Sequence, residues 1–223
     1  MTKTNIKGII FDFDGLILDT ETPEMLAWEK AFTEHSLSFP IERYLNSIGT
    51  VSDNHFVQGF MQEMGLSEGE IQQTVLAYQS HIATFEHMNH PREGVLDLIH
   101  DAEKIGLRLA VASNSYRTWV VDNLQRLALD SHFDPICTRD DVTNSKPDPE
   151  LYNLVLAKWG FTSNEVLALE DSPNGIKAAK NAGIFCVAVP NPITIRMDVT
   201  LADLIFSSFS DFSLQEILFQ LEK

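Results

Sequence analysis

The chain has 223 residues, of which 44% are hydrophobic and 22% are charged. This composition is typical of a soluble globular protein with one large domain, or one domain plus a small insert. The 32 acidic residues outnumber the 16 basic ones and give a formal net charge of −16, which disfavours nucleic acids and anionic membranes as partners. No apolar stretch is long enough to span a bilayer, and the polar start lacks the pattern of a secretion signal. We therefore expect a cytoplasmic protein, and we expect it to be a monomer.

The first predicted element is a buried strand, "IKGIIF", residues 6–11, which is short, continuous and rich in β-branched side chains. The pattern then changes to the spacing of amphipathic helices, with no strand evident. Helices are predicted over residues 23–35, 53–64 and 68–85. A proline and a glycine in "NHPREGV", residues 89–95, mark a boundary after this helical stretch.

Beyond that boundary, predicted helices and strands alternate. The strands cover residues 107–113, 133–138, 165–171, 184–189 and, weakly, 202–206. The helices cover residues 95–106, 118–129, 149–160, 173–183 and 214–222. Such alternation is typical of a parallel sheet with helices on both faces. The predicted fold is therefore α/β, a Rossmann-like sheet formed by residues 1–16 and 88–223, with an all-helical domain, residues 17–87, inserted after its first strand.

Polar side chains follow the predicted strands at the points where they end. Ligands of open parallel sheets bind at the carboxyl ends of the strands, so these clusters are candidates for one shared site. Their carboxylates, hydroxyls and one ammonium group suit a hard cation with oxygen ligands together with a phosphate, whereas zinc would favour histidine or cysteine. The clusters are Asp12 with Asp14, Ser113–Asn114–Ser115, Lys146, and Glu170 with Asp171.

Each cluster also has a purely structural interpretation. Taken singly, Ser113 and Ser115 are typical turn residues, and Lys146 is typical of a solvated loop. Two acids at the end of a buried strand are harder to explain. Like charges repel, and burial removes their hydration, so a bound cation or a reaction must offset the cost.

The tryptophans lie at amphipathic helix positions and are expected to be core residues: Trp28, Trp119 and Trp159.

Four motifs occur in a fixed order along the chain, and together they resemble those of haloacid dehalogenase-superfamily phosphohydrolases. The resemblance is to the subgroup with a helical cap after the first strand, and within it to the β-phosphoglucomutase-like phosphatases and mutases. The motifs are "DFDGLILDT" (12–20), "VASNS" (111–115), "SKPDPE" (145–150) and "LEDSPNGIKAAKNAG" (169–183).

The resemblance implies a role for each motif. Asp12 would attack phosphorus and form an aspartyl-phosphate, while Asp14 would protonate the leaving oxygen and then activate water. Ser113 would donate a hydrogen bond to the transferring phosphoryl group, and Lys146 would neutralise its charge and pair with Asp12.

The resemblance also implies Mg²⁺ as the cofactor. The ion would lie between Asp12, the backbone carbonyl of Asp14 and Asp171, with Glu170 close by. It would offset the crowded negative charge and let an anionic carboxylate approach an anionic phosphate.

Substrate-binding residues are predicted on both sides of the site. Asn114 and Ser115 accompany the phosphate-binding serine, and Arg117 is the base placed to touch a distal anionic group, although a surface position in the first turn of its helix is an equal alternative. In the inserted domain, three residues are expected to reach the non-reacting end of the substrate: Thr50, Ser52 and His55.

The sequence departs from related sugar phosphomutases at two positions. These usually carry a histidine where this chain has Glu24, and an arginine that the stretch 49–55 lacks. The sequence therefore favours a Mg²⁺-dependent phosphatase of a small phosphorylated metabolite such as a sugar phosphate. A phosphomutase and, less well supported, a non-catalytic binding protein are the alternatives.

Overall fold

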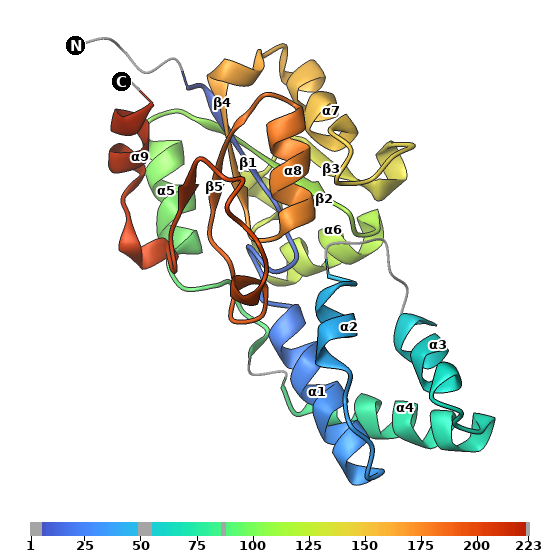
Figure 1. The fold of residues 1–223 in the computed structure, drawn as a ribbon. Coiled ribbons are helices and arrows are strands. Elements are labelled where there is room, and N and C mark those ends of the chain that lie inside the picture. The colour runs from blue at the N-terminus through green and yellow to red at the C-terminus, as the bar shows by residue number, and fades with distance from the viewer. Residues whose placement is uncertain (1–5, 49–54, 86–87, 222–223) are drawn as a thin grey trace.

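The computed structural model describes residues 6–48, 55–85 and 88–221. Within these ranges the centre of the molecule is a six-stranded parallel sheet with the strand order β3-β2-β1-β4-β5-β6 (Figure 1). The strands are β1 Gly8–Phe11, β2 Arg108–Ser113, β3 Ile136–Thr138, β4 Val166–Glu170, β5 Phe185–Ala188 and β6 Leu204–Ile205. The α/β fold with a Rossmann-like parallel sheet is therefore confirmed.

Strand β1 is buried on both faces of the sheet. Its alternate side chains point to opposite sides, and helices cover each side. Ile9 and Phe11 pack in one hydrophobic cluster with helices α5 Val95–Lys104, α6 Arg117–Arg126 and α9 Leu214–Gln220. Ile10 packs on the other face with α7 Glu150–Trp159 and α8 Pro173–Asn181. The two helical layers lie on either side of the sheet (Figure 1).

The strand order reverses between β1 and β4, and this reversal positions the site. The chain runs from β1 outward through β2 and β3, then returns to β4 on the other side of β1. Phe11 lies in register with Leu169, and the amide of Asp12 donates to the Leu169 carbonyl at 3.0 Å. Asp12 therefore lies beside the residues that follow β4, at the kind of switch point where parallel sheets bind ligands.

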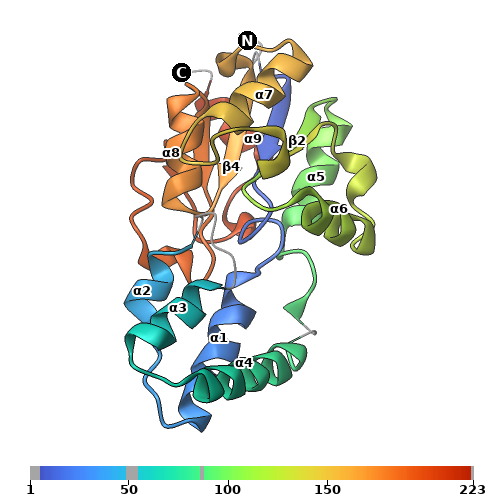
Figure 2. The same ribbon diagram turned by 90° about the vertical axis from the view of Figure 1, so that its right-hand side faces the viewer.

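The inserted segment forms a separate group of helices below the sheet (Figures 1 and 2). It consists of α1 Glu21–Glu34, α2 Ile41–Leu45, α3 His55–Glu63 and α4 Glu68–Ala83. Trp28 lies at the centre of its hydrophobic core and stacks on Tyr78 with ring centroids 4.0 Å apart. Within the described ranges, none of the helices has the length and apolar character needed to cross a membrane.

Arg92 ties the two connections of this insert to the sheet. Its guanidinium donates to the carbonyl oxygens of Gly15 and Val189, both at 2.7 Å, and to that of Pro190 at 3.0 Å. Gly15 precedes the insert and Arg92 follows it, so both connections meet at the carboxyl edge of the sheet. The predicted domain boundary at residue 16 fits this arrangement but stays a prediction, as does the one at residue 87, which lies outside the described residues.

Three local predictions from sequence were incomplete or wrong. Helix α2 was not predicted, because five residues are too few to show a helical period. Strand β3 begins at Ile136 rather than at residue 133, since Pro135 has no N–H to donate to a neighbouring strand. Trp119 was expected in the core, but it is 47% exposed, and its indole N–H is hydrogen-bonded to Asp14 instead.

Gly94 provides a test of this packing. Its φ of 84° is disfavoured for other residues, and a Cβ there would lie 2.7 Å from Cβ of Phe209. Gly94→Ala should lower the free energy of unfolding by about 1 kcal/mol or more, measured by urea denaturation. Gly69→Ala, in helix α4 with open space around the new Cβ, is the matched control and should not destabilise the protein. Equal stability of both variants would contradict the packing described here.

Candidate active site

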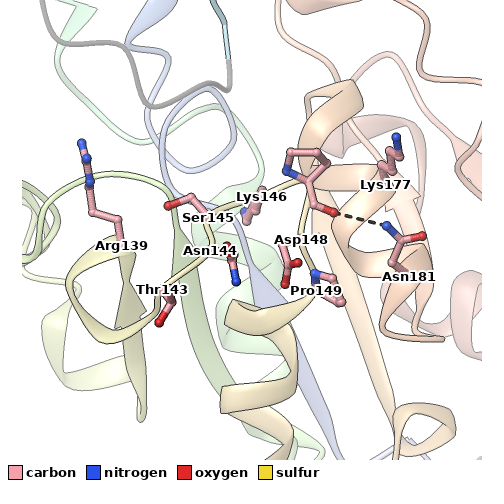
Figure 3. A pocket seen from close by; sticks show the side chains of 10 residues that line it. Arg139, Thr143, Asn144, Ser145, Lys146, Asp148, Pro149, Lys177 and Asn181 are labelled. Carbon is pink, nitrogen blue, oxygen red and sulfur yellow. Dashed lines mark hydrogen bonds between the residues drawn. The ribbon is translucent and has the colours of Figure 1, made fainter.

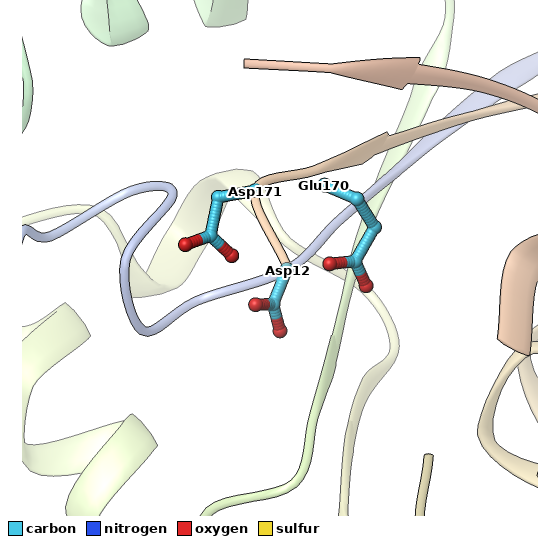
Figure 4. Close-up of side chains that lie close together, drawn as sticks. All are labelled: Asp12, Glu170 and Asp171. Atoms are coloured by element: carbon cyan, nitrogen blue, oxygen red, sulfur yellow. The ribbon is translucent and has the colours of Figure 1, made fainter. Parts of the chain in front are cut away.

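Three carboxylates meet where strands β1 and β4 end (Figure 4). Asp12, Glu170 and Asp171 each offer an oxygen within 4.8 Å of the others, and all three residues are buried. Within the described part of the chain, Glu170 Oε2 and Asp171 Oδ1 are buried without a hydrogen-bond partner. Buried carboxylate oxygens without donors are suitable ligands for a hard divalent cation.

The electrostatics of this cluster favour the same ligand. Burial, reinforced by the charge of Asp12, raises the pKa of Glu170 to about 7. Burial, together with Asp12 and Glu170, also raises the pKa of Asp171 well above its usual range. A divalent cation would reverse these shifts by favouring the charged carboxylates. The residues present therefore fit Mg²⁺, which Asp12 and Asp171 would hold directly, with Glu170 beside them.

Two glycines make room for these carboxylates. A Cβ on Gly15 would lie 2.2 Å from Asp171 Oδ2, and a Cβ on Gly175 would lie 1.9 Å from Glu170 Oε2. Gly15 also has a φ of 77°, which lets the chain turn sharply after Asp14. The glycines of the first and last sequence motifs thus allow the backbone to approach the carboxylates closely.

Lys146 joins the nucleophile candidate, Asp12, to Glu170 of the carboxylate cluster. Its ammonium donates to Asp12 Oδ1 at 2.8 Å and to Glu170 Oε1 at 2.6 Å, and Glu170 also accepts from the Tyr152 hydroxyl at 2.5 Å. Although burial opposes it, the Asp12 and Glu170 carboxylates raise the pKa of Lys146. The ammonium therefore stays charged next to the carboxylate expected to react.

The loop that carries Lys146 is held from strand β2. The Asn114 side chain accepts from the Lys146 amide at 2.8 Å and donates to its carbonyl at 3.1 Å. The same loop lines a cavity of about 690 Å³, and Arg139 and Lys177 also line this cavity (Figure 3). The side chain of Asn114 thus holds the backbone of Lys146 in place. The predicted contact of Asn114 with substrate stays a prediction.

Asp14 is held by donors from the end of strand β2, from the turn that follows it and from helix α6. One oxygen, Oδ2, accepts from the hydroxyls of Ser115 at 2.6 Å and Ser113 at 3.4 Å, and the other, Oδ1, accepts from the indole N–H of Trp119 at 2.9 Å. Burial raises the pKa of Asp14, against the opposing hydrogen bonds from Ser115 and Trp119. A raised pKa suits a carboxyl group that must carry a proton.

The remaining predicted substrate residues are less well placed. The Arg117 guanidinium donates to Asp141 Oδ2 at 2.5 Å and to the Ile136 carbonyl at 3.1 Å, contacts that favour the alternative of a structural surface residue. Thr50 and Ser52 lie outside the described residues. His55 begins helix α3, but its side chain is also outside the described part, so these three substrate contacts stay predictions.

Sequence reasoning overlooked Asn191, which links the core to the insert. Its side-chain amide donates to Asp171 Oδ2 at 3.0 Å and to Glu21 Oε2 at 3.1 Å. Asn191 follows strand β5, so the rule that ligands bind at the carboxyl ends of strands could have found it. Trp119 and Tyr152 gave no comparable signal, because helical spacing marks both only as apolar positions.

Two acids of helix α1 lie on the insert side of the site. Burial, with Asp171 and Asp14 nearby, raises the pKa of Glu21 well above its usual range. Burial also raises the pKa of Glu24, which accepts from the Tyr44 hydroxyl at 3.3 Å. This end of the site therefore already holds several acids.

Comparison with known proteins identifies the same family that the four sequence motifs indicate. Residues 9–189 match the sequence profile of the family described as haloacid dehalogenase-like hydrolase. The chain is 39% identical over 189 residues to a protein of Bacillus subtilis named "Putative phosphatase YhcW", covering 85% of this chain and 86% of that protein. It is 26% identical over 179 residues to the "Phosphorylated carbohydrates phosphatase" of Thermotoga maritima, covering 80% and 82%.

A solved structure is also similar. A mutant of CbbY from Rhodobacter sphaeroides, crystallised with xylulose-(1,5)bisphosphate, superimposes with a TM-score of 0.70 at 28% identity, covering 92% of this chain and 96% of that chain. The family resemblance inferred from the four motifs is thus confirmed over most of the chain. The chain belongs to the haloacid dehalogenase-like hydrolase family and is a phosphohydrolase.

Proposed function

We propose that the chain is a Mg²⁺-dependent phosphatase that hydrolyses a small phosphorylated metabolite, such as a sugar phosphate, through an aspartyl-phosphate on Asp12. The observation that carries this proposal is the buried set of Asp12, Lys146, Glu170 and Asp171, in which two carboxylate oxygens lack donors. The phosphatase names of the relatives and the sugar bisphosphate bound to CbbY support it. The cytoplasmic location and the monomeric state remain predictions.

The chain's own residues account for the proposed steps. Magnesium, when bound, would supply positive charge that lets two anions meet. Lys146 fixes the Asp12 carboxylate through Oδ1, and Asp12 attacks phosphorus while the leaving oxygen takes a proton from Asp14. Asp14 then takes a proton from the water that hydrolyses the aspartyl-phosphate. Ser113, at the end of β2, is the proposed hydrogen-bond donor to the phosphoryl group.

The acids of helix α1 favour a phosphatase over a phosphomutase. A mutase must hold an intermediate with two phosphates, whereas a phosphatase has no such requirement. Glu21 and Glu24 are half-buried beside the site, and Glu24 occupies the position where related mutases carry a histidine. An acid at this position, ionised or neutral, supplies no positive charge to bind a second phosphate.

The metal assignment can be tested by removal. A chelator should abolish hydrolysis of p-nitrophenyl phosphate, and added Mg²⁺ should restore it. Asp171→Asn should weaken Mg²⁺ binding at least about tenfold, measured by calorimetry, because it removes a charged ligand. Asp203→Asn, which alters a carboxylate paired with Lys180 away from the site, is the control. Full activity in chelator would rule out a magnesium requirement.

Substitutions of the two aspartates of the first motif, Asp12 and Asp14, should affect turnover differently. Asp12→Asn should abolish both turnover and phosphoenzyme formation, because an amide cannot attack phosphorus. Asp14→Asn should slow alkyl phosphates by about 100-fold or more and p-nitrophenyl phosphate much less, since a good leaving group needs no proton. Equal slowing of both esters by Asp14→Asn would exclude its acid role.

The insert should govern substrate selection. We expect it to close over the bound ester as a lid and to place His55 on the non-reacting end of the substrate. His55→Ala should raise KM and change the ranking of a panel of sugar phosphates, while p-nitrophenyl phosphate should be little affected. His81→Ala, which removes a partly buried histidine paired with Glu34, is the matched control. A uniform loss across all substrates would argue against selection by the insert.

A further inference from the structure

Trp119 is placed unlike the other tryptophans of the chain. It is 47% exposed, whereas Trp28 and Trp159 are 2% and 6% exposed. Burial of the indole ring therefore does not explain its position. Its one polar group, the indole N–H, donates to Oδ1 of Asp14 at 2.9 Å, a residue 105 positions earlier in the chain. The contact joins the first turn of helix α6 to the proposed general acid.

The two oxygens of Asp14 have partners of different chemical capacity. An indole N–H can only donate, so Oδ1 must act as an acceptor as long as the Trp119 contact persists. The partner of Oδ2 at 2.6 Å is the Ser115 hydroxyl, which can either donate or accept. A proton on Asp14 is therefore compatible with the Ser115 side, and it conflicts with the Trp119 side.

We propose that Trp119 is a positioning residue that fixes the Asp14 carboxyl group so that Oδ2 carries the catalytic proton. This inference rests on the role of Asp14 proposed above. In the first step the Asp12 carboxylate forms a bond to phosphorus, and the bond from phosphorus to the leaving oxygen breaks with its electron pair on that oxygen. The proton moves from Asp14 Oδ2 to the leaving oxygen. The products are an aspartyl-phosphate, the free alcohol and ionised Asp14.

The same contacts stabilise the carboxylate that remains after proton transfer. Trp119 donates to Oδ1 and Ser115 donates to Oδ2, so the new negative charge has two donors in place while Ser113 serves the phosphoryl group. Trp119 also lies in the first turn of α6, Arg117–Arg126, where the helix dipole favours a nearby anion. Little rearrangement is then needed as the charge develops.

Trp119→Phe tests the inference, because it removes the N–H donor and keeps an aromatic ring at an exposed position where folding tolerates the change. Trp159→Phe is the matched control: it also removes an indole donor, here to the Asp134 carbonyl at 2.8 Å, but in a residue remote from Asp14. Both variants should be assayed with p-nitrophenyl phosphate, with an alkyl phosphate and, by calorimetry, with Mg²⁺ alone.

In Trp119→Phe the ratio of kcat for the alkyl phosphate to kcat for p-nitrophenyl phosphate should fall at least about tenfold, with Mg²⁺ affinity unchanged. In Trp159→Phe the ratio should stay at its original value. An equal loss of both activities in Trp119→Phe would show a merely structural role and overturn the inference. A rise in the ratio would also overturn it, because Trp119 would then restrain the acid in an unproductive orientation.

Asp14→Asn, assayed in parallel, separates this inference from the proposed function. If Asp14→Asn selectively slows the alkyl phosphate and Trp119→Phe does not, only the role of Trp119 is wrong. If Asp14→Asn slows both esters equally, the acid role of Asp14 fails, and the inference fails with it.

Discussion

The pairing of Lys146 with two carboxylates is the interaction on which the site depends. Its ammonium lies between Asp12 Oδ1 and Glu170 Oε1 in a buried environment, where an unpaired charge would be strongly destabilising. One cation cannot balance three buried carboxylates, and the orphaned oxygens of Glu170 and Asp171 mark where charge is still missing. The fold thus gathers more negative than positive charge at this point, and a divalent cation could balance the excess.

The parallel sheet is what makes such a cluster possible. Parallel strands end at one edge, and the reversal between β1 and β4 leaves the residues that follow them unobstructed by a crossover helix. Gly15 and Gly175 then allow the backbone to approach the carboxylates without steric conflict. Crowding of the carboxylates around Asp12 is destabilising. The extensive hydrophobic packing on both faces of β1 offsets this cost.

Most of the fold and the core of the site could be predicted from sequence, because both follow from local pattern. Buried strands, helical periods and polar residues at strand ends are all visible in short windows. The partners of individual side chains are not. The preference of Arg117 for Asp141 depends on residues 24 positions apart, and the Trp119 contact with Asp14 spans 105. Helical spacing placed Trp119 on an apolar stripe, but only the tertiary structure shows which group its N–H reaches.

The contacts of Arg92 have a consequence for how the protein is made. One guanidinium binds carbonyl groups of Gly15, Val189 and Pro190, so segments from the beginning, middle and end of the chain must meet at a single point. Contacts of such long sequence separation form late, since the loop between them must close first. During synthesis, Asp12 is complete long before Lys146 and Asp171 emerge. A growing chain therefore carries its proposed nucleophile without the side chains that surround it in the folded protein, and the proposed site can form only after most of the core has been translated.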